Sequence, residues 1–430
     1  MKRLFIISFA ISITLIFAEC FAQFDRNSPN REANNFIFDF FAQPTNSPDS
    51  VEITVFYKIA YQALLFSQLE TGFSTNYQLE ATFRDANGII RRRANVFDTI
   101  IVQTFEETRA ISNFRFGFLS QTLPLSNYFV QIQLLDFRNQ ALHRATFQFS
   151  KDNQGSIKYI PLFASIGKEN EYVSQVANGI SFASPAFSIY LPINLPNVGE
   201  LIRYEISKID EKEAVNWGDF SPITGEIEPT NNFYLSFDLE DSGIAVSQNY
   251  IEAKNTFFIL TDKPNTFVPG SYNLILKYGV RLDTFSFRVV WENMPKSLRD
   301  PQYMLRVMEY ILTDDEIKRF RAFKRRQLPE ILFEYWKRLD PTPNTPYNES
   351  MNEYFTRVDY ASTAFRTSSQ SDGALTDRGM IYILFGPPDD IRRFHQNNRL
   401  REQWTYRRLI KEYTFEQVST GNFRLIQIKE

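Results

Sequence analysis

The chain has 430 residues but only one cysteine and two histidines, which are the residue types that most often bind transition metals. Cys20 lies in the N-terminal segment, and His143 and His395 lie far apart in the sequence. Thiolate and histidine-rich metal centres are therefore excluded from the rest of the chain, as are disulfides. A chain of this length buries enough surface to fold without disulfides, and we expect it to need no metal and no cofactor.

The sequence also lacks the common catalytic and nucleotide-binding motifs. No serine stands in a Gly-x-Ser-x-Gly pattern, so neither His143 nor His395 has a recognisable nucleophile to activate. No glycine-rich fingerprint for phosphate or dinucleotide binding follows a predicted strand. No segment resembles a nucleic-acid-binding fold, and we expect no nucleic-acid partner.

Only one long apolar run is present, Leu4–Ala18, and two positive charges precede it. This is the pattern of a secretory signal peptide, and the run is shorter than the roughly 20 residues that a membrane span needs. An alternative is a lipoprotein anchored at Cys20, but Glu19 stands where lipoprotein processing needs a small residue. We therefore predict signal cleavage after Ala22 and an exported mature chain without a transmembrane span. It would be periplasmic, associated with the outer envelope, or secreted.

Aromatic residues are abundant, with 42 phenylalanines and 21 tyrosines, whereas glycine is sparse, with 16 residues. Because aromatic and β-branched residues are enriched in strands, this composition favours a protein rich in β-sheet. An alternative interpretation is that the aromatic side chains form sugar-binding platforms. We favour core packing, which is the commoner use of such residues.

The N-terminal two thirds of the chain alternates apolar and polar residues at the period of β-strands. After a polar, disordered leader at 23–35, strands are predicted from 36 to 152, with Asp85–Gly88 as a hairpin turn. A second β region follows at 153–292, and the hairpin that closes it, from Tyr272 onward, resembles the one that closes the first region. The pattern predicts two tandem all-β sandwich domains of the Ig-like type.

From residue 293 the apolar residues recur at helical spacing, which predicts a third domain at 293–430. Prolines and a capping box indicate helix starts at Asp300–Pro301, Thr313–Glu316 and Pro329. A further helix carries Met351, Phe355 and Val358 on one face.

The end of this domain is predicted to form a small sheet. The apolar segment Met380–Leu384 predicts a buried central strand between two turns, and shorter strands are expected near Trp404 and Leu425. The third domain is therefore predicted to be mixed α/β, a helical bundle that leads into a small sheet.

Short motifs in this domain occur in the order found in a family of exported bacterial proteins. The motifs are Tyr335–Pro346, Arg357–Ala361, Gly373–Asp377, Arg378–Asp390, Glu402–Tyr406 and Phe423–Ile426. On these residues the C-terminal third of the chain resembles the GWxTD domain family. That family has no settled activity, so the resemblance implies export and this C-terminal domain but neither a reaction nor a substrate.

One residue departs from the family pattern. The pentapeptide Gly373–Asp377 carries Ala374 where the family has its name-giving tryptophan. If that indole is a ligand platform, this chain has lost it, and if it only packs against the sheet, the loss is a local packing change. The residues that the motifs single out as a binding or structural motif are Trp336, Asp340, Gly373, Thr376, Asp377, Arg378, Gly379, Gly386, Pro387, Pro388, Asp389 and Trp404.

The charged pair Asp377 and Arg378 has two interpretations. In the functional one it catalyses a reaction or binds a ligand. In the structural one Thr376 and Asp377 accept backbone N–H bonds in a turn, and Arg378 holds a carboxylate in a bidentate pair. We favour the structural interpretation, and the predicted partners of Arg378 are Asp340, Glu349 and Asp359.

The run Gly386–Asp390 also has two interpretations. Its two carboxylates, Asp389 and Asp390, are suited to binding a hard cation or to acid–base catalysis. Because Pro387 and Pro388 remove backbone donors, the run is not a phosphate-binding loop. We favour a helix cap formed by the two aspartates.

The densest basic run is Lys318–Arg326, in a C-terminal part that carries 23 basic and 19 acidic residues from residue 293 on. A basic helix can bind polyanions or acidic membrane surfaces. We favour a solvated face with Phe320 and Phe323 turned inward. A second use is docking against the two predicted sandwiches, which are net acidic.

These observations predict a non-enzymatic, exported binding or scaffold protein of the cell envelope, since no catalytic set assembles in the sequence. Its expected partner is an envelope protein or a surface glycan. The alternative is an exported hydrolase that acts on glycans or peptides with Asp377, Asp389 and Glu402 as carboxylates. A glycosidase would need two of these carboxyl groups roughly 5–9.5 Å apart in an open cleft.

Overall fold

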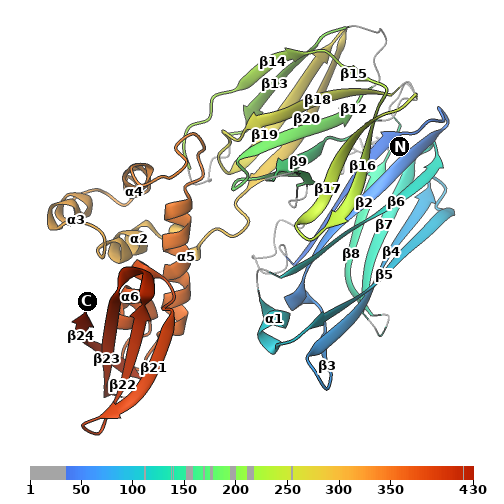
Figure 1. Cartoon of the computed structure of the whole chain (residues 1–430). Helices are drawn as coiled ribbons and strands as arrows, with labels where there is room; N and C mark the ends of the chain where they lie inside the picture. The colour runs from blue at the N-terminus through green and yellow to red at the C-terminus, as the bar shows by residue number, and fades with distance from the viewer. Residues whose placement is uncertain are drawn as a thin grey trace, which may run out of the picture. The chain divides into compact units, whose positions relative to one another are not determined.

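The computed structural model describes residues 35–430 except 111–112, 137, 139, 152–157, 168–169, 175–177, 194–199, 211–216, 253–254 and 420 (Figure 1). The predicted signal peptide and nearly all of the predicted leader lie outside the described residues. The described chain divides into two compact units, of which the first comprises 35–38 with 55–158 and the second 39–54 with 159–430. Most of the chain is β-sheet in several sandwich-like sheets, and the C-terminal region has helices and a small sheet.

The first unit contains two sheets, one with the strand order β1-β2-β6 and one with the order β3-β4-β7-β8, in which β5 also pairs with β4. The strands are β1 (Phe36–Pro44), β2 (Ser50–Ala60), β3 (Ser67–Gln68), β4 (Phe73–Asp85), β5 (Ile90–Val102), β6 (Phe114–Pro124), β7 (Tyr128–Asp136) and β8 (Ala141–Phe149). Two short helices, η1 (Tyr61–Ala63) and α1 (Phe105–Arg109), connect them. Residues 39–54, at the facing ends of β1 and β2, belong to the second unit.

The predicted hairpin turn after β4 is confirmed. The Asp85 carboxylate accepts the backbone N–H groups of Asn87 and Ile89 at 2.9 and 3.0 Å, and Gly88 adopts a positive φ of 78°. The alternation of the sequence sets the register, because Leu79 and Leu134 face each other and both are buried.

The second unit begins with a seven-stranded sheet, β15-β18-β12-β9-β10-β17-β16, and a five-stranded sheet, β11-β20-β19-β13-β14. The strands are β9 (Leu162–Ile166), β10 (Glu171–Val173), β11 (Gly179–Ser181), β12 (Ala186–Pro192), β13 (Ile202–Lys208), β14 (Ile223–Ile227), β15 (Thr230–Asn231), β16 (Phe233–Glu240), β17 (Gly243–Tyr250), β18 (Thr256–Pro264), β19 (Gly270–Tyr278) and β20 (Arg281–Val290). The predicted closing hairpin is confirmed, since Tyr272 pairs with Phe287 and Leu274 with Phe285.

The C-terminal helices begin where the caps predict. They are η2 (Lys296–Arg299), α2 (Pro301–Met308), α3 (Asp314–Arg321), α4 (Leu328–Lys337), α5 (Glu349–Ala364), η3 (Gly373–Leu375) and α6 (Asp377–Phe385). Asp300 accepts the N–H of Gln302 at the start of α2, and Thr313 and Glu316 form a complete capping box at the start of α3. The predicted helix with Met351, Phe355 and Val358 on one face is α5, and all three side chains are buried.

The predicted central strand at Met380–Leu384 is wrong, because these residues form α6. Thr376 is the N-cap of this helix, and its side chain accepts the N–H of Gly379 at 3.1 Å. Ile381 and Ile383 are buried, whereas Met380, Tyr382 and Leu384 are only partly buried. An apolar run of five residues does not distinguish a strand from a helix by its periodicity, and here the cap decides for the helix.

The chain ends in a four-stranded antiparallel sheet, β21-β22-β23-β24, next to α6 (Figure 1). Its strands are β21 (Asp390–Gln396), β22 (Arg399–Tyr406), β23 (Lys411–Ser419) and β24 (Asn422–Lys429), and η4 (Arg407–Leu409) joins β22 to β23. The strands expected near Trp404 and Leu425 are therefore confirmed. Ile381 of α6, Trp404 and Phe415 share one apolar core.

The basic run is only partly helical. Helix α3 ends at Arg321, and Lys324–Arg326 lie in the connection to α4. Phe320 is buried, as predicted, but the prediction that Phe323 also turns inward is wrong, because 37% of it is exposed.

Candidate functional site

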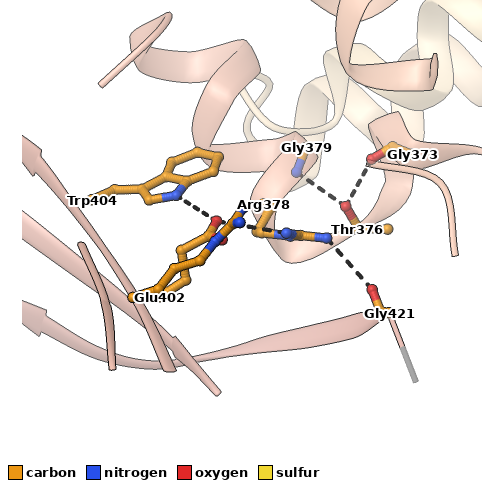
Figure 2. Close-up of polar contacts among 8 residues, drawn as sticks. Gly373, Thr376, Arg378, Gly379, Glu402, Trp404 and Gly421 are labelled. Atoms are coloured by element: carbon orange, nitrogen blue, oxygen red, sulfur yellow. Dashed lines mark hydrogen bonds and ion pairs between the residues drawn. The ribbon is translucent and has the colours of Figure 1, made fainter. Parts of the chain in front are cut away.

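The Gly-x-x-Thr-Asp motif forms a tight junction between η3 and α6. The hydroxyl group of Thr376 donates to the carbonyl oxygen of Gly373 at 2.8 Å and accepts the N–H of Gly379 at 3.1 Å (Figure 2). Thr376 thus ends one helical turn and begins the next. The expected turn role of this hydroxyl is therefore present, in the form of a helix N-cap.

The two glycines of this junction allow a close approach of the backbone. A Cβ atom on Gly373 would lie 2.3 Å from the carbonyl oxygen of Ala361 in α5, and one on Gly379 would lie 2.0 Å from that of Gly373. Neither glycine is among the residues with positive φ. Space, rather than backbone conformation, requires glycine at both positions.

Ala374 occupies the position of the family's tryptophan. The residue is fully buried, its N–H donates to Asp372 at 3.1 Å, and its carbonyl oxygen accepts the hydroxyl group of Tyr310 at 2.9 Å. In this chain the position lies in the packed interior rather than on the surface. This location agrees with the packing interpretation of the motif.

Arg378 extends from α6 into an aromatic and acidic environment. Its guanidinium group lies 4.2 Å from the ring centre of Phe423 and 5.5 Å from that of Phe365. It approaches Glu402 at 3.6 Å and donates to the carbonyl oxygen of Gly421 at 3.5 Å (Figure 2). Burial lowers the pKa of the guanidinium group below its ordinary value, and the charge of Glu402 opposes this shift.

Glu402, on β22, is the centre of this cluster. Only 2% of its side chain is exposed, and its carboxylate accepts the indole N–H of Trp404 at 2.8 Å and the guanidinium N–H of Arg393 at 2.7 Å. Together with Arg378 these donors surround both oxygens of the carboxylate. The arrangement holds a buried negative charge in place.

The partners predicted for Arg378 are wrong, because its ion pair is with Glu402 and the three predicted carboxylates bind other groups. Asp340 accepts the N–H of Thr342 at 2.9 Å, and Glu349 accepts the hydroxyl group of the same threonine at 2.6 Å. Asp359 accepts the backbone N–H groups that begin η2. The true partner, Glu402, lies in strand β22, and Arg378 lies in the first turn of helix α6, where the sequence predicts a turn before a strand.

The other two candidate carboxylates also have backbone partners. Asp377 accepts the N–H of Leu425 at 2.7 Å and so ties α6 to β24. Asp389 accepts the N–H of Arg407 at 2.6 Å, which fixes the connection from β22 to β23. The predicted helix cap at Asp389–Asp390 is wrong, since Asp390 begins strand β21.

Gly386 and the two prolines end α6. Gly386 is its C-cap, has a positive φ of 78°, and accepts the hydroxyl group of Tyr406 at 2.9 Å. Pro387 is exposed and Pro388 partly buried, and both lie between this cap and β21. The run therefore redirects the chain from helix to sheet.

The two motif tryptophans are core residues. Trp336 of α4 packs against Tyr354 and Phe355 of α5, and its carbonyl oxygen accepts the amide group of Asn348 at 2.7 Å. Trp404 of β22 packs against Phe415 and is 1% exposed. Neither ring presents a free face to a sugar.

Across the part of the chain that the structure describes, no group of three or more His, Cys, Asp or Glu side chains is placed to hold a metal ion. Within the same residues, no helix has the length and apolarity to cross a membrane.

The chain has remote likenesses to two solved structures. The chain is 8% identical to the C-terminal domain of the Streptococcus pyogenes antigen I/II-family protein AspA, over 60% of this chain and 99% of that one, with a TM-score of 0.16. It is 11% identical to native E. coli alpha-2-macroglobulin, over 61% of this chain and 16% of that one, with a TM-score of 0.13. Both TM-scores are too low to indicate a shared fold. No curated protein matches the chain.

The family comparison confirms the resemblance that the motifs indicated. The matched residues are 270–427, so the match begins at β19 and contains α2–α6 and the C-terminal sheet. The C-terminal third of this chain carries a GWxTD domain.

Proposed function

We propose that the protein is an exported binding or scaffold protein of the cell envelope. One observation carries the proposal: the three candidate catalytic carboxylates are all engaged in holding the GWxTD domain together. Glu402 is buried among three donors, and Asp377 and Asp389 each accept a backbone N–H group. A hydrolase would instead keep two carboxyl groups facing an open cleft.

The β-rich part fits such a role. We propose that it consists of two tandem Ig-like sandwiches, at 36–152 and 153–292, which display the GWxTD domain at 293–430. Strands β1 to β8 pair among themselves, as do β9 to β20, in support of two sandwiches. The proposed location rests on the signal peptide predicted from the sequence, and the proposed partner is an envelope protein or a surface glycan.

Two measurements on the full-length exported protein test the proposal. Cross-linking in intact cells, followed by affinity purification, should recover defined envelope partners. The purified protein should show no turnover of polysaccharides or unfolded protein substrates above that of the variant D377N/E402Q/D389N. Hydrolysis by the unmodified protein that the triple variant lacks, when both are folded, would establish the hydrolase instead.

A further inference from the structure

A cavity of about 330 Å³ lies between α2, α3 and the start of α4. Four of its nine lining residues are apolar: Leu305, Phe320 and Leu328, which are buried, and Phe323, which is 37% exposed. The volume is at the small end of the roughly 300–1,000 Å³ range of ligand pockets. It suits one large apolar side chain rather than the two acyl chains of a phospholipid.

The rim of this cavity is basic. Arg306, Arg321 and Arg325 line it, against a single carboxylate, Glu309, which pairs with Arg321. Among the described residues, Arg325 forms an ion pair only with Asp300, at 3.9 Å, and both side chains are more than half exposed. Such a surface pair contributes little, so the guanidinium group of Arg325 is available to a partner.

Further positive charge flanks the rim. Lys324 and Arg326 are exposed neighbours of Phe323 and Arg325 in the connection between α3 and α4. Like Arg306, they have no ion-pair partner among the described residues. Apolar lining residues and cations without an ion-pair partner thus lie close together. A surface of this kind is suited to an acidic peptide with one apolar side chain.

We propose that this surface, here called the α2–α4 groove, binds an acidic peptide segment of another envelope protein. One phenylalanine or leucine side chain of that segment enters the cavity, and carboxylates on both sides of it meet Arg306, Arg321 and Arg325. This inference rests on the proposed binding function and names its surface and the chemistry of its partner.

Fluorescence anisotropy with the full-length protein tests the proposal. The probe is a labelled peptide with one phenylalanine between pairs of glutamates, and its two controls carry alanine for phenylalanine or lysine for glutamate. The protein should bind the probe at low salt, the alanine peptide at least about tenfold more weakly, since the anchor no longer buries apolar surface, and the lysine peptide not at all. Binding of the probe should weaken as salt is raised.

Variants locate the binding in the groove. R306E and, separately, F323S should each weaken binding of the probe at least about tenfold at a temperature where both variants are folded. R306E changes an exposed side chain and should leave the melting temperature unchanged, whereas F323S changes a partly packed ring and should lower it. The matched control is R408E, which makes the same charge change at an exposed arginine in η4, away from the groove. It should leave binding unchanged.

Several outcomes would overturn the proposal. These are no binding of the probe at millimolar concentration, equal binding of the alanine peptide, or equal weakening by R408E. Tighter, R306E-sensitive binding to phosphatidylglycerol vesicles would assign the groove to a lipid surface, and R306E-sensitive self-association in sedimentation would assign it to a second copy of the chain. If peptides fail to bind while envelope cross-links persist in R306E, the groove proposal fails and the proposed binding function stands.

Discussion

The GWxTD domain contains two clusters of arginine and phenylalanine side chains that differ in burial. In the first, Arg378 lies between Phe365 and Phe423, and 13% of its side chain is exposed. In the α2–α4 groove, Arg321 and Arg325 have 60% and 69% of their side chains exposed. The residue types are the same, but only the first cluster contains a buried carboxylate.

This difference separates a structural use of arginine from a binding use. A buried guanidinium group needs a counter-ion at all times, so Arg378 and Glu402 stabilise the fold together. An exposed guanidinium group is solvated by water and is free to exchange that water for a partner's carboxylate. The contacts of Arg378 and Glu402 therefore fit the structural interpretation of the motif, whereas the proposed binding surface lies outside the motif.

The largest effect is expected for Glu402→Ala. The substitution leaves Arg378 buried without its counter-ion and Trp404 without its acceptor, and should destabilise the protein by about 3–5 kcal/mol in urea unfolding. Glu412→Ala, on the neighbouring strand, is the control. Its carboxylate is 34% exposed, pairs with Lys429 at 3.7 Å and accepts the amide group of Gln403 at 2.9 Å, so the loss should be about 1 kcal/mol.

The opposite result for Glu402 would be informative. Active sites often hold charges under strain, and removing such a charge tends to raise stability. An unchanged or raised melting temperature for Glu402→Ala would indicate that the cluster of Arg378 and Glu402 has a functional role rather than a structural one. It would also favour the alternative hypothesis that the protein is a hydrolase.

Gly379→Ala tests the packing of the motif junction without changing a charge. Alanine is the better helix former by about 1 kcal/mol, but its Cβ would lie 2.0 Å from the carbonyl oxygen of Gly373. We expect a net loss of about 1–3 kcal/mol from overpacking, measured by thermal and urea unfolding. Thr356→Ala at an exposed position of α5 is the control and should be neutral or slightly stabilising. Equal effects of the two variants would contradict the close approach.

Much of the fold could be predicted from the sequence because its signals are local. The hairpin at Asp85–Gly88 and the capping box at Thr313 depend on residues that are a few positions apart, and both occur as predicted. The prediction of a strand at the position of α6 was wrong because the apolar run there also fits a strand. The N-cap role of Thr376 could have been predicted and would have indicated a helix.

The contacts within the candidate site were harder to predict from the sequence. The pairing of Arg378 with Glu402 joins a helix to a strand, and no local pattern specifies it. The groove depends on how three helices pack, although the basic run at Lys318–Arg326 marked its position. The sequence therefore predicts local structure more reliably than contacts between residues that are far apart in the chain.

Asp389→Ala should have a smaller effect than either motif substitution. It removes a hydrogen bond at 2.6 Å to the N–H of Arg407, on an exposed connection, and should cost about 1 kcal/mol in urea unfolding. Asp390→Ala is the matched control, because that exposed side chain makes no hydrogen bond within the described part of the chain. Equal losses from the two substitutions would show that the carboxylate of Asp389 has no specific role.

The effect expected from Glu416 depends on pH. Its side chain is 10% exposed, between the 2% of Glu402 and the 30% of Glu309. It lies on β23 and pairs with Arg399 at 2.5 Å and Arg401 at 2.7 Å, whose side chains are 61% and 18% exposed. Hydrogen bonds from Arg399 and Arg401 hold the pKa of Glu416 below its ordinary value of 4.5. Because the folded state binds this proton less readily than the unfolded state, ionised Glu416 stabilises the fold above pH 4.5.

The sign of this linkage gives the last prediction. Glu416→Gln should be less stable than the unmodified protein at pH 7, and the difference should shrink as the pH falls through the lowered pKa, where the carboxylate takes up its proton. Urea unfolding at pH 7, 5, 4 and 3 measures it. Asp315→Asn, at a side chain that is 97% exposed, is the control and should show almost no difference at any of these pH values. A difference for Glu416→Gln that stays constant with pH would mean that shape, and not charge, accounts for its contribution.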